Sequence, residues 1–341
     1  MGNECCVARL DLFCFCRNRR TTSGHKWSVY LSDLPNHEIQ SKLSELQGRI
    51  AALEFQSPPE RHSQNIPNPP FSGPPPEAPF MAFSTCSASD FLHPRFQEIC
   101  GLIRHPFLWQ RKLWEWTFVI HHLLESGVVK PGSRGLVFGV GNERLPALFA
   151  GMGASIVATD APVDVSEKWG WNASGQHATA LNEMRYPEIV DGSVFDANVT
   201  FQTCDMNNIH PELHGFDFNW SSCCFEHLGD LEAGIQFVIN AVEKTLRVGG
   251  VAVHTTEFNL SSNDKTVESG VVSIYRRRDL EDLAERLRSR GHTVKPFIVA
   301  PNSYYWDFHV DLPPYKANPH LKLVLSEYVA TSAGIVVRRG R

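Results

Sequence analysis

The sequence has no excess of positive charge, no long apolar run and no even set of cysteines. Its formal net charge is -5, so it lacks the basic surface that binds nucleic acid. No apolar run approaches the roughly 20 residues that span a membrane as a helix. Nine cysteines in a chain of this length indicate reduced thiols in a cytosol-like compartment. We therefore predict a cytoplasmic protein with no nucleic-acid partner and no transmembrane segment.

The N-terminal part of the chain differs in composition from the rest. Apolar residues from Ile39 to Leu53 recur at spacings of four and three, which predicts a short coiled-coil-like helix. Such a helix either joins two copies into a homo-oligomer or packs as a plain amphipathic helix. We assign residues 1–56 to this segment and residues 57–90, with their proline runs, to an extended linker. Residues 91–341 then form one large domain, for which a hydrophobic content of 42% is sufficient.

A strand, a glycine turn, a helix and a second strand follow one another after residue 134. Leu136–Phe138 is a short apolar run suited to a buried strand, and Gly139 and Gly141 allow a tight turn with bare backbone. Residues 145–150 continue as a helix that Gly151-Met-Gly153 ends. Residues 156–158 form the next strand, and Asp160 closes it at a spacing typical of a carboxylate that binds ribose. The pattern predicts an α/β fold with a cofactor that contains ribose.

Arg144 stands where a dinucleotide fingerprint places its third glycine, which disfavours a nicotinamide cofactor. The segment resembles class I S-adenosylmethionine-dependent methyltransferases of the branch that acts on small molecules. The resemblance extends over about residues 100 to 300. Val199–Met206 resembles the third strand of that family, Phe216–Leu228 the fourth strand with a Glu-His-Leu loop, and Ala241–His254 the helix, glycine turn and fifth strand.

This resemblance implies a Rossmann-like, seven-stranded, mostly parallel sheet with helices on both faces and S-adenosylmethionine (SAM) as cofactor. Asp205 would accept from the adenine amine, and Met206 would lie beside the ring. The sequence departs from the family at Val137, where members usually carry an acid, and at Glu143, which replaces a glycine and is expected to face the methionine end of SAM. The cofactor contacts that we predict are Gly139, Val140, Gly141, Glu143, Asp160, Asp205, Met206 and Ser221.

Methyl transfer to a hydroxyl needs a base near the fourth strand. We predict that His227 is this base, since imidazole titrates near neutral pH, and that Glu226 orients it. His254, Glu257 and Asn259 follow the fifth strand at the edge where open α/β sheets bind ligands, so we predict that they contact substrate. If Glu226, His227, His254 and Glu257 converged, they could hold a divalent cation. The spacing does not require one, and we predict no metal.

The remaining predictions concern the flanks of the domain. Residues 91–129, rich in aromatic side chains, are expected to form helices that cover the site, and Arg276–Arg278 to begin a solvated helix. The last two strands would lie near 293–310 and 322–338, and residues 304–311 alternate like an outer strand.

We predict a methyltransferase whose acceptor is a small-molecule hydroxyl, as on a sugar or natural product; N- or C-methylation stays open. One alternative is a non-catalytic interaction protein with a degenerate domain, and another is a protein that binds SAM without transferring its methyl group.

Overall fold

The apolar runs assemble into one mixed sheet. The computed structural model describes residues 78–162, 178–316 and 318–341. In these ranges the strand order is β3-β2-β1-β4-β5-β9-β8-β7, and β6 pairs with β9. The strands are β1 (Arg134–Phe138), β2 (Ser155–Asp160), β3 (Val199–Thr203), β4 (Phe216–Ser222), β5 (Leu246–Asn259), β6 (Thr293–Val294), β7 (Val310–Asp311), β8 (Lys322–Leu325) and β9 (Tyr328–Arg338).

Strands β1 to β5 run parallel, and β9 is antiparallel to β5. The strand order reverses at β1, which pairs with β2 on one side and β4 on the other. This arrangement confirms the predicted Rossmann-like α/β fold, in which ligands bind where the order reverses. The turn and helix after β1 also agree with the sequence prediction, because α5 (Leu145–Gly151) begins there with Pro146 in its first turn.

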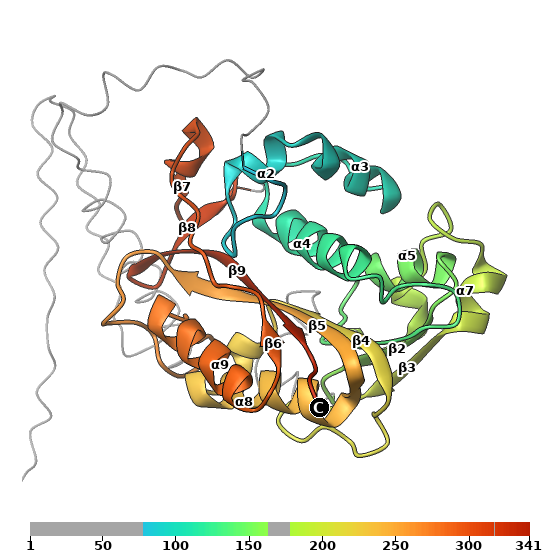
Figure 1. Cartoon of the computed structure of the whole chain (residues 1–341). Coiled ribbons are helices and arrows are strands. Elements are labelled where there is room, and N and C mark those ends of the chain that lie inside the picture. Colours follow the sequence, from blue (N-terminus) through green and yellow to red (C-terminus); the bar gives the residue numbers. More distant parts are fainter. Residues whose placement is uncertain (1–77, 163–177, 317) are drawn as a thin grey trace, which may run out of the picture. The chain divides into compact units, whose positions relative to one another are not determined.

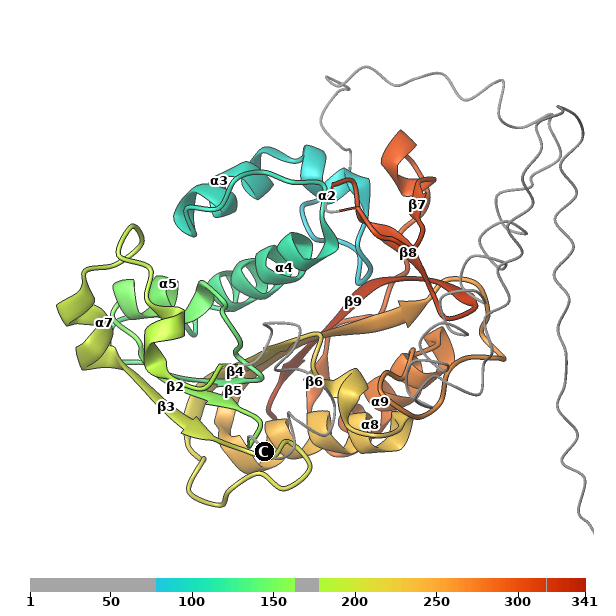
Figure 2. The same cartoon turned by 180° about the vertical axis from the view of Figure 1, so that it is seen from behind.

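Helices cover both faces of the sheet (Figure 1; Figure 2 shows the same layers from behind). One face carries α2 (Ala88–Leu92), α3 (Pro94–Leu102), α4 (Arg111–Glu125), α5 and α7 (Gly192–Asn198), and the other carries α8 (Leu231–Asn240) and α9 (Arg277–Ser289). Short helical turns are η3 (Leu181–Met184), η4 (Phe225–His227), η5 (Ala241–Thr245) and η6 (Tyr305–Asp307).

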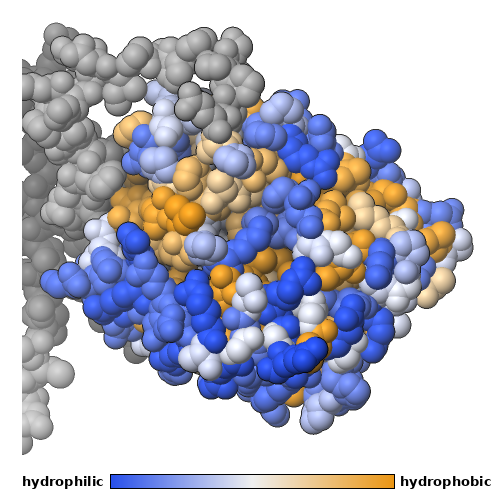
Figure 3. All heavy atoms as spheres, viewed as in Figure 1, coloured by the Kyte–Doolittle hydropathy of each residue, from blue (hydrophilic) through white to orange (hydrophobic). Residues whose placement is uncertain are grey.

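Each face has its own apolar core. Trp114 and Phe118 of α4 pack with Val253 on one side, and Phe237 of α8 packs with Leu283 of α9 on the other. On the face drawn in Figure 3 hydrophilic residues dominate the region of α9, and hydrophobic residues gather above it. Helix α9 begins at Arg277 as expected, but its N-cap Arg276 is buried and pairs with Asp279 and Glu268, so this arginine is not solvated.

The C-terminal strands differ from the prediction. The expected strand at 322–338 is a hairpin of β8 and β9, because Ser326 turns the chain with a φ of 57°. Residues between β6 and β7 bond instead to the segment near residue 84: the Ser84 N–H donates to the Ile298 carbonyl, and the Ala300 N–H donates to the Thr85 hydroxyl. The described part of the sheet thus has nine strands rather than seven. Residues 304–311 contain η6 and, at their end, the two-residue β7, which is the outer strand at this edge of the sheet.

The segment near residue 84, which we assigned to the linker, is packed within the domain. Met81, Cys86 and Asp90 are buried, and Cys86 donates its N–H to the Ser332 carbonyl of β9. The helix predicted at 39–53 and the linker up to residue 77 lie outside the described residues. None of the helices in the described ranges is long and apolar enough to span a membrane.

Candidate active site

The carboxyl ends of β1, β2 and β4 meet at the point where the strand order reverses. The glycine turn after β1 is tied to the end of β2: the Gly141 N–H donates to Asp160 Oδ2 at 2.8 Å, and the Val140 N–H donates to the Thr159 carbonyl. Gly139 and Gly141 have φ values of 62° and 49°, a region that glycine adopts without strain. The predicted turn is therefore present, and its bare backbone lies beside a buried carboxylate.

Asp160 is almost fully buried and also accepts the Ala178 N–H at 3.1 Å. Asp205 follows the neighbouring strand β3, and the Cys204 N–H donates to the Asp160 carbonyl oxygen. The two predicted acids thus sit at adjacent strand ends, with Met206 buried beside them. Their contacts here are with the protein backbone, since Asp205 accepts the Asn207 N–H. Their contacts with a ribose and an adenine stay predictions.

Cys224 connects the loop after β4 to the glycine turn. Its thiol lies 3.5 Å from the Gly139 carbonyl oxygen, and a Cβ atom placed on Gly139 would come within 2.5 Å of the sulfur. Glycine at this position is therefore required by the close approach of the loop as well as by its φ.

Glu143 is buried between two tryptophans. Its carboxylate accepts from Trp116 Nε1 at 3.2 Å and from Trp220 Nε1 at 3.1 Å, which links α4 to β4. Burial raises the pKa of Glu143 to about 7. The carboxylate predicted to face SAM is thus held by the protein, and its contact with a cofactor stays a prediction.

His254 and Glu257 do not meet. They are three residues apart on β5, so their side chains point to opposite faces of the sheet. His254 is buried against Phe237 of α8 and bonds through Nδ1 to Ser221 Oγ at 2.8 Å. The four-residue convergence that a cation site would have needed is therefore not formed, and Ser221 lies with His254 on the α8 side.

Asn259, predicted to contact substrate, shapes the loop after β5. Its amide donates to the Lys265 carbonyl and the Thr266 hydroxyl, and its oxygen accepts the N–H groups of Ser261 and Ser262. These bonds stabilise the turn, so the structure gives Asn259 a role in holding the backbone.

The loop after β4 places Glu226 and His227 on η4. Glu226 is fully buried, accepts from the Thr256 hydroxyl, and burial raises the pKa of its carboxyl group to about 7. His227 is half-buried, and its Nδ1 lies 2.7 Å from the Val271 carbonyl oxygen. This carbonyl holds the imidazole through Nδ1, and the predicted orienting role of Glu226 stays a prediction.

Three charged residues at the start of α4 were missed by the sequence analysis. Arg111 lies 2.5 Å from Glu257 Oε1, and Lys112 lies 2.8 Å from Glu115 Oε2. Burial alone would raise the pKa of Glu115, but Lys112 and Arg111 hold this pKa below its ordinary value. The signal was present, because basic residues precede an acid by three and four positions in an otherwise aromatic helix.

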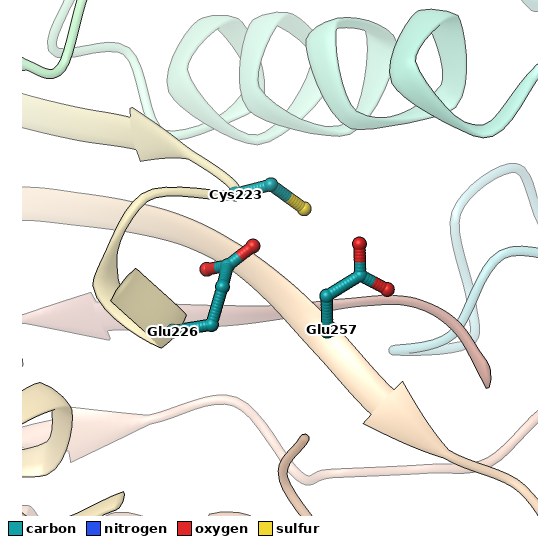
Figure 4. Close-up of side chains that lie close together, drawn as sticks. All are labelled: Cys223, Glu226 and Glu257. Carbon is teal, nitrogen blue, oxygen red and sulfur yellow. The ribbon is translucent and has the colours of Figure 1, made fainter. Parts of the chain in front are cut away.

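Figure 4 shows the side chains that converge below α4. One ligand-type atom each of Cys223, Glu226 and Glu257 lies within 4.8 Å of the other two. Cys223 reaches this position with a φ of 52°, which is uncommon for a residue other than glycine. Glu226 Oε1 and Glu257 Oε2 are both buried and have no hydrogen-bond partner among the described residues. Two acceptors are thus available for a ligand at the edge of β4 and β5.

No family model matches the chain, and no curated protein matches it. Solved structures similar to it include magnesium protoporphyrin IX methyltransferase from Synechocystis PCC 6803 with bound SAH, at 12% identity and a TM-score of 0.40, over 65% of this chain and 80% of that one. The N-terminal domain of EvdMO1, in the presence of SAH and D-fucose, is 14% identical with a TM-score of 0.39, over 65% and 82%. The [4+2]-cyclase SpnF is 12% identical with a TM-score of 0.42, over 77% and 89%. These identities and TM-scores are low, so the function of this chain has to be inferred from its own residues.

Proposed function

We propose that this protein is a SAM-dependent methyltransferase whose acceptor is a hydroxyl group of a small molecule. The observation that carries the proposal is the buried Asp160 at the end of β2, bonded to the glycine turn after β1 where the strand order reverses. A ligand with ribose and no phosphate suits this place, because Arg144 occupies the position of the third glycine that a pyrophosphate would favour.

The groups at this place are of the chemical types that would bind SAM. The turn of Gly139 to Gly141 presents backbone at the switch point, Asp160 offers a carboxylate for the ribose, and Asp205 offers one for the adenine amine. When bound, SAM supplies an electrophilic methyl group on a sulfonium. The protein then has to align an acceptor and remove its proton.

His227 is the residue that we assign to the proton transfer. With Nδ1 donating to the Val271 carbonyl, the neutral imidazole carries its lone pair on Nε2. The acceptor hydroxyl would lose its proton to Nε2 as its oxygen bonds to the methyl carbon, while the bond from that carbon to the sulfonium breaks and its electron pair stays on sulfur. The two residues interact electrostatically: burial raises the pKa of Glu226 to about 7, and the neighbouring His227 counteracts part of this rise.

A calorimetric titration tests the cofactor. Wild-type protein should bind SAM and not NADH, and Asp160→Asn should bind SAM about tenfold or more weakly, because it loses a charge-assisted hydrogen bond. Asp282→Asn, an exposed acid on α9, is the matched control and should bind like wild type. Urea denaturation verifies that both variants fold. If wild-type protein binds no SAM, the proposal is wrong and the interaction-protein alternative stands.

Product analysis then tests the reaction. Formation of S-adenosylhomocysteine with a panel of hydroxyl acceptors should be lost in His227→Ala, while SAM binding is retained. SAM binding without this product for any acceptor in the panel would favour a protein that holds SAM without transferring its methyl group.

A further inference from the structure

The cluster below α4 holds more negative than positive charge. Its acids are Glu115, Glu226 and Glu257, and the cations that pair with them in the described structure are Arg111 and Lys112. Both cations already have partners: Lys112 donates to the Ser222 carbonyl and forms an ion pair with Glu115, and Arg111 forms an ion pair with Glu257 and donates to the Ser332 hydroxyl. With all three acids ionised, Arg111 and Lys112 leave one negative charge unbalanced. His227 also faces Glu226 electrostatically, but as the base of the proposed reaction it starts as a neutral imidazole and adds no charge.

The same cluster also leaves hydrogen-bond acceptors unused. Glu226 Oε1 and Glu257 Oε2 are buried without a partner among the described residues, and their side chains turn toward the same space as the Cys223 thiol (Figure 4). A buried carboxylate oxygen without a donor costs free energy, so a bound donor at this place would be stabilised. The side chain of Lys112 is 38% exposed, so the rim of the cluster reaches the surface.

An ammonium group matches both the charge and the acceptors. It carries one positive charge and three N–H donors in tetrahedral directions. Two acceptors that each lie about 2.8 Å from one nitrogen are about 4.6 Å apart at a tetrahedral angle. This distance falls inside the 4.8 Å within which one ligand-type atom each of Cys223, Glu226 and Glu257 lies from the other two. A pair of hydroxyl groups would supply donors without the charge, and a divalent metal would supply an extra charge that only a Cys223 thiolate could balance.

We propose that the substrate carries a protonated amine that binds between Glu226 and Glu257. The proposal rests on the proposed function for the identity of the reaction. A protonated nitrogen has no lone pair, so this amine is an anchor and the methyl group goes to a hydroxyl of the same molecule. The substrate class is therefore an amino alcohol or aminosugar rather than a neutral sugar.

A simple cation tests the site without any cofactor. Thermal unfolding of the full chain is measured in methylammonium chloride and, at the same ionic strength, in tetramethylammonium chloride, which has no N–H donor. Methylammonium should raise the unfolding temperature in a saturable way, and the effect should vanish in Glu226→Gln and in Glu257→Gln. Glu232→Gln, an exposed acid of α8, is the control and should respond like wild type. An equal response to both salts overturns the proposal.

A second experiment compares matched ligands by calorimetry in the presence of S-adenosylhomocysteine. Each aminosugar or amino alcohol of a panel is paired with the analogue that has a hydroxyl in place of the amine. We expect the better amines to bind about tenfold more tightly than their analogues, and Glu257→Gln to remove the difference. Three outcomes would each overturn the amine site. They are equal binding within all pairs, absence of binding by every amine, and stabilisation by zinc with none by methylammonium. A lack of SAM binding would contradict the proposed function only. The response to methylammonium would still decide whether the amine site exists, because that measurement needs no cofactor.

Discussion

Glu143 provides the sharpest test of the physical description, because a single substitution changes its charge and leaves its shape. Glu143→Gln keeps one oxygen to accept from Trp116 or Trp220 and removes the ability to ionise. In the folded protein burial raises the pKa of this carboxyl group to about 7, whereas an unfolded glutamate titrates near 4.5. Between these two values the folded state holds the proton and the unfolded state releases it. Stability must therefore fall as the pH rises through this window.

The magnitude follows from the difference in pKa. At about 1.4 kcal/mol per pKa unit, ionisation of Glu143 lowers the free energy of unfolding by about 3 kcal/mol above pH 7, and has no effect well below pH 4.5. The glutamine variant lacks this dependence. It instead turns its NH₂ group toward one indole N–H, which costs about 1 to 3 kcal/mol at every pH. The variant should therefore be less stable than wild type near pH 5 and nearly as stable, or more stable, near pH 8.

Urea denaturation of the ligand-free protein between pH 5 and pH 8, followed by tryptophan fluorescence, measures this difference. Glu226 also titrates near neutral pH, but it is present in both proteins, so its contribution cancels when the two stabilities are subtracted. Glu232→Gln, on the surface of α8, should keep the wild-type pH dependence. Parallel stability curves for wild type and Glu143→Gln would show that Glu143 is not buried in the way the structure describes.

Two further substitutions probe the packing of α4 on the sheet. Gly334→Ala would place a Cβ atom 2.2 Å from the Phe118 ring, so it should lower the free energy of unfolding by about 1 to 3 kcal/mol. Gly101→Ala is the control and should change stability little, because the space around Gly101 is open. Equal effects of the two substitutions in urea denaturation would contradict the packing of Phe118 on β9. Arg111→Met should destabilise the fold by about 3 kcal/mol or more, because it leaves Glu257 buried without its cation. Glu257→Gln in the same chain should restore part of the loss, and a double-mutant cycle with no coupling would refute the ion pair.

Local signals were sufficient for the first half of the sheet. Apolar runs of strand length separated by glycines predict β1, the turn, α5 and β2, because each of these elements depends on residues that are neighbours in sequence. The parallel direction of the strands then brings Asp160 and Asp205 to the same edge, as the family resemblance implied.

The C-terminal strands could not be predicted in the same way. Whether residues 295–309 extend the sheet depends on the segment near residue 84, more than two hundred positions away, whose Ser84 and Thr85 hydroxyls accept backbone N–H groups of these residues. No pattern in a short stretch of sequence shows whether these residues bond to the sheet or to the segment near residue 84. For His254 and Glu257, in contrast, a usable signal existed, because an odd separation along a strand already places two side chains on opposite faces.

The sequence by itself determined the class of fold, the position of the glycine turn and the acids and histidine that follow the strands, since strand length, alternation and glycine conformation are properties of short segments. Only the tertiary structure decided which of these groups act together. In the sequence, the charged residues at the start of α4 are typical of a solvated helix end: Arg111, Lys112 and Glu115. In the structure, α4 lies across the ends of β4 and β5, and these residues form ion pairs there. Burial there removes water from the charges, and this desolvation makes the choice of partner for each charge decisive.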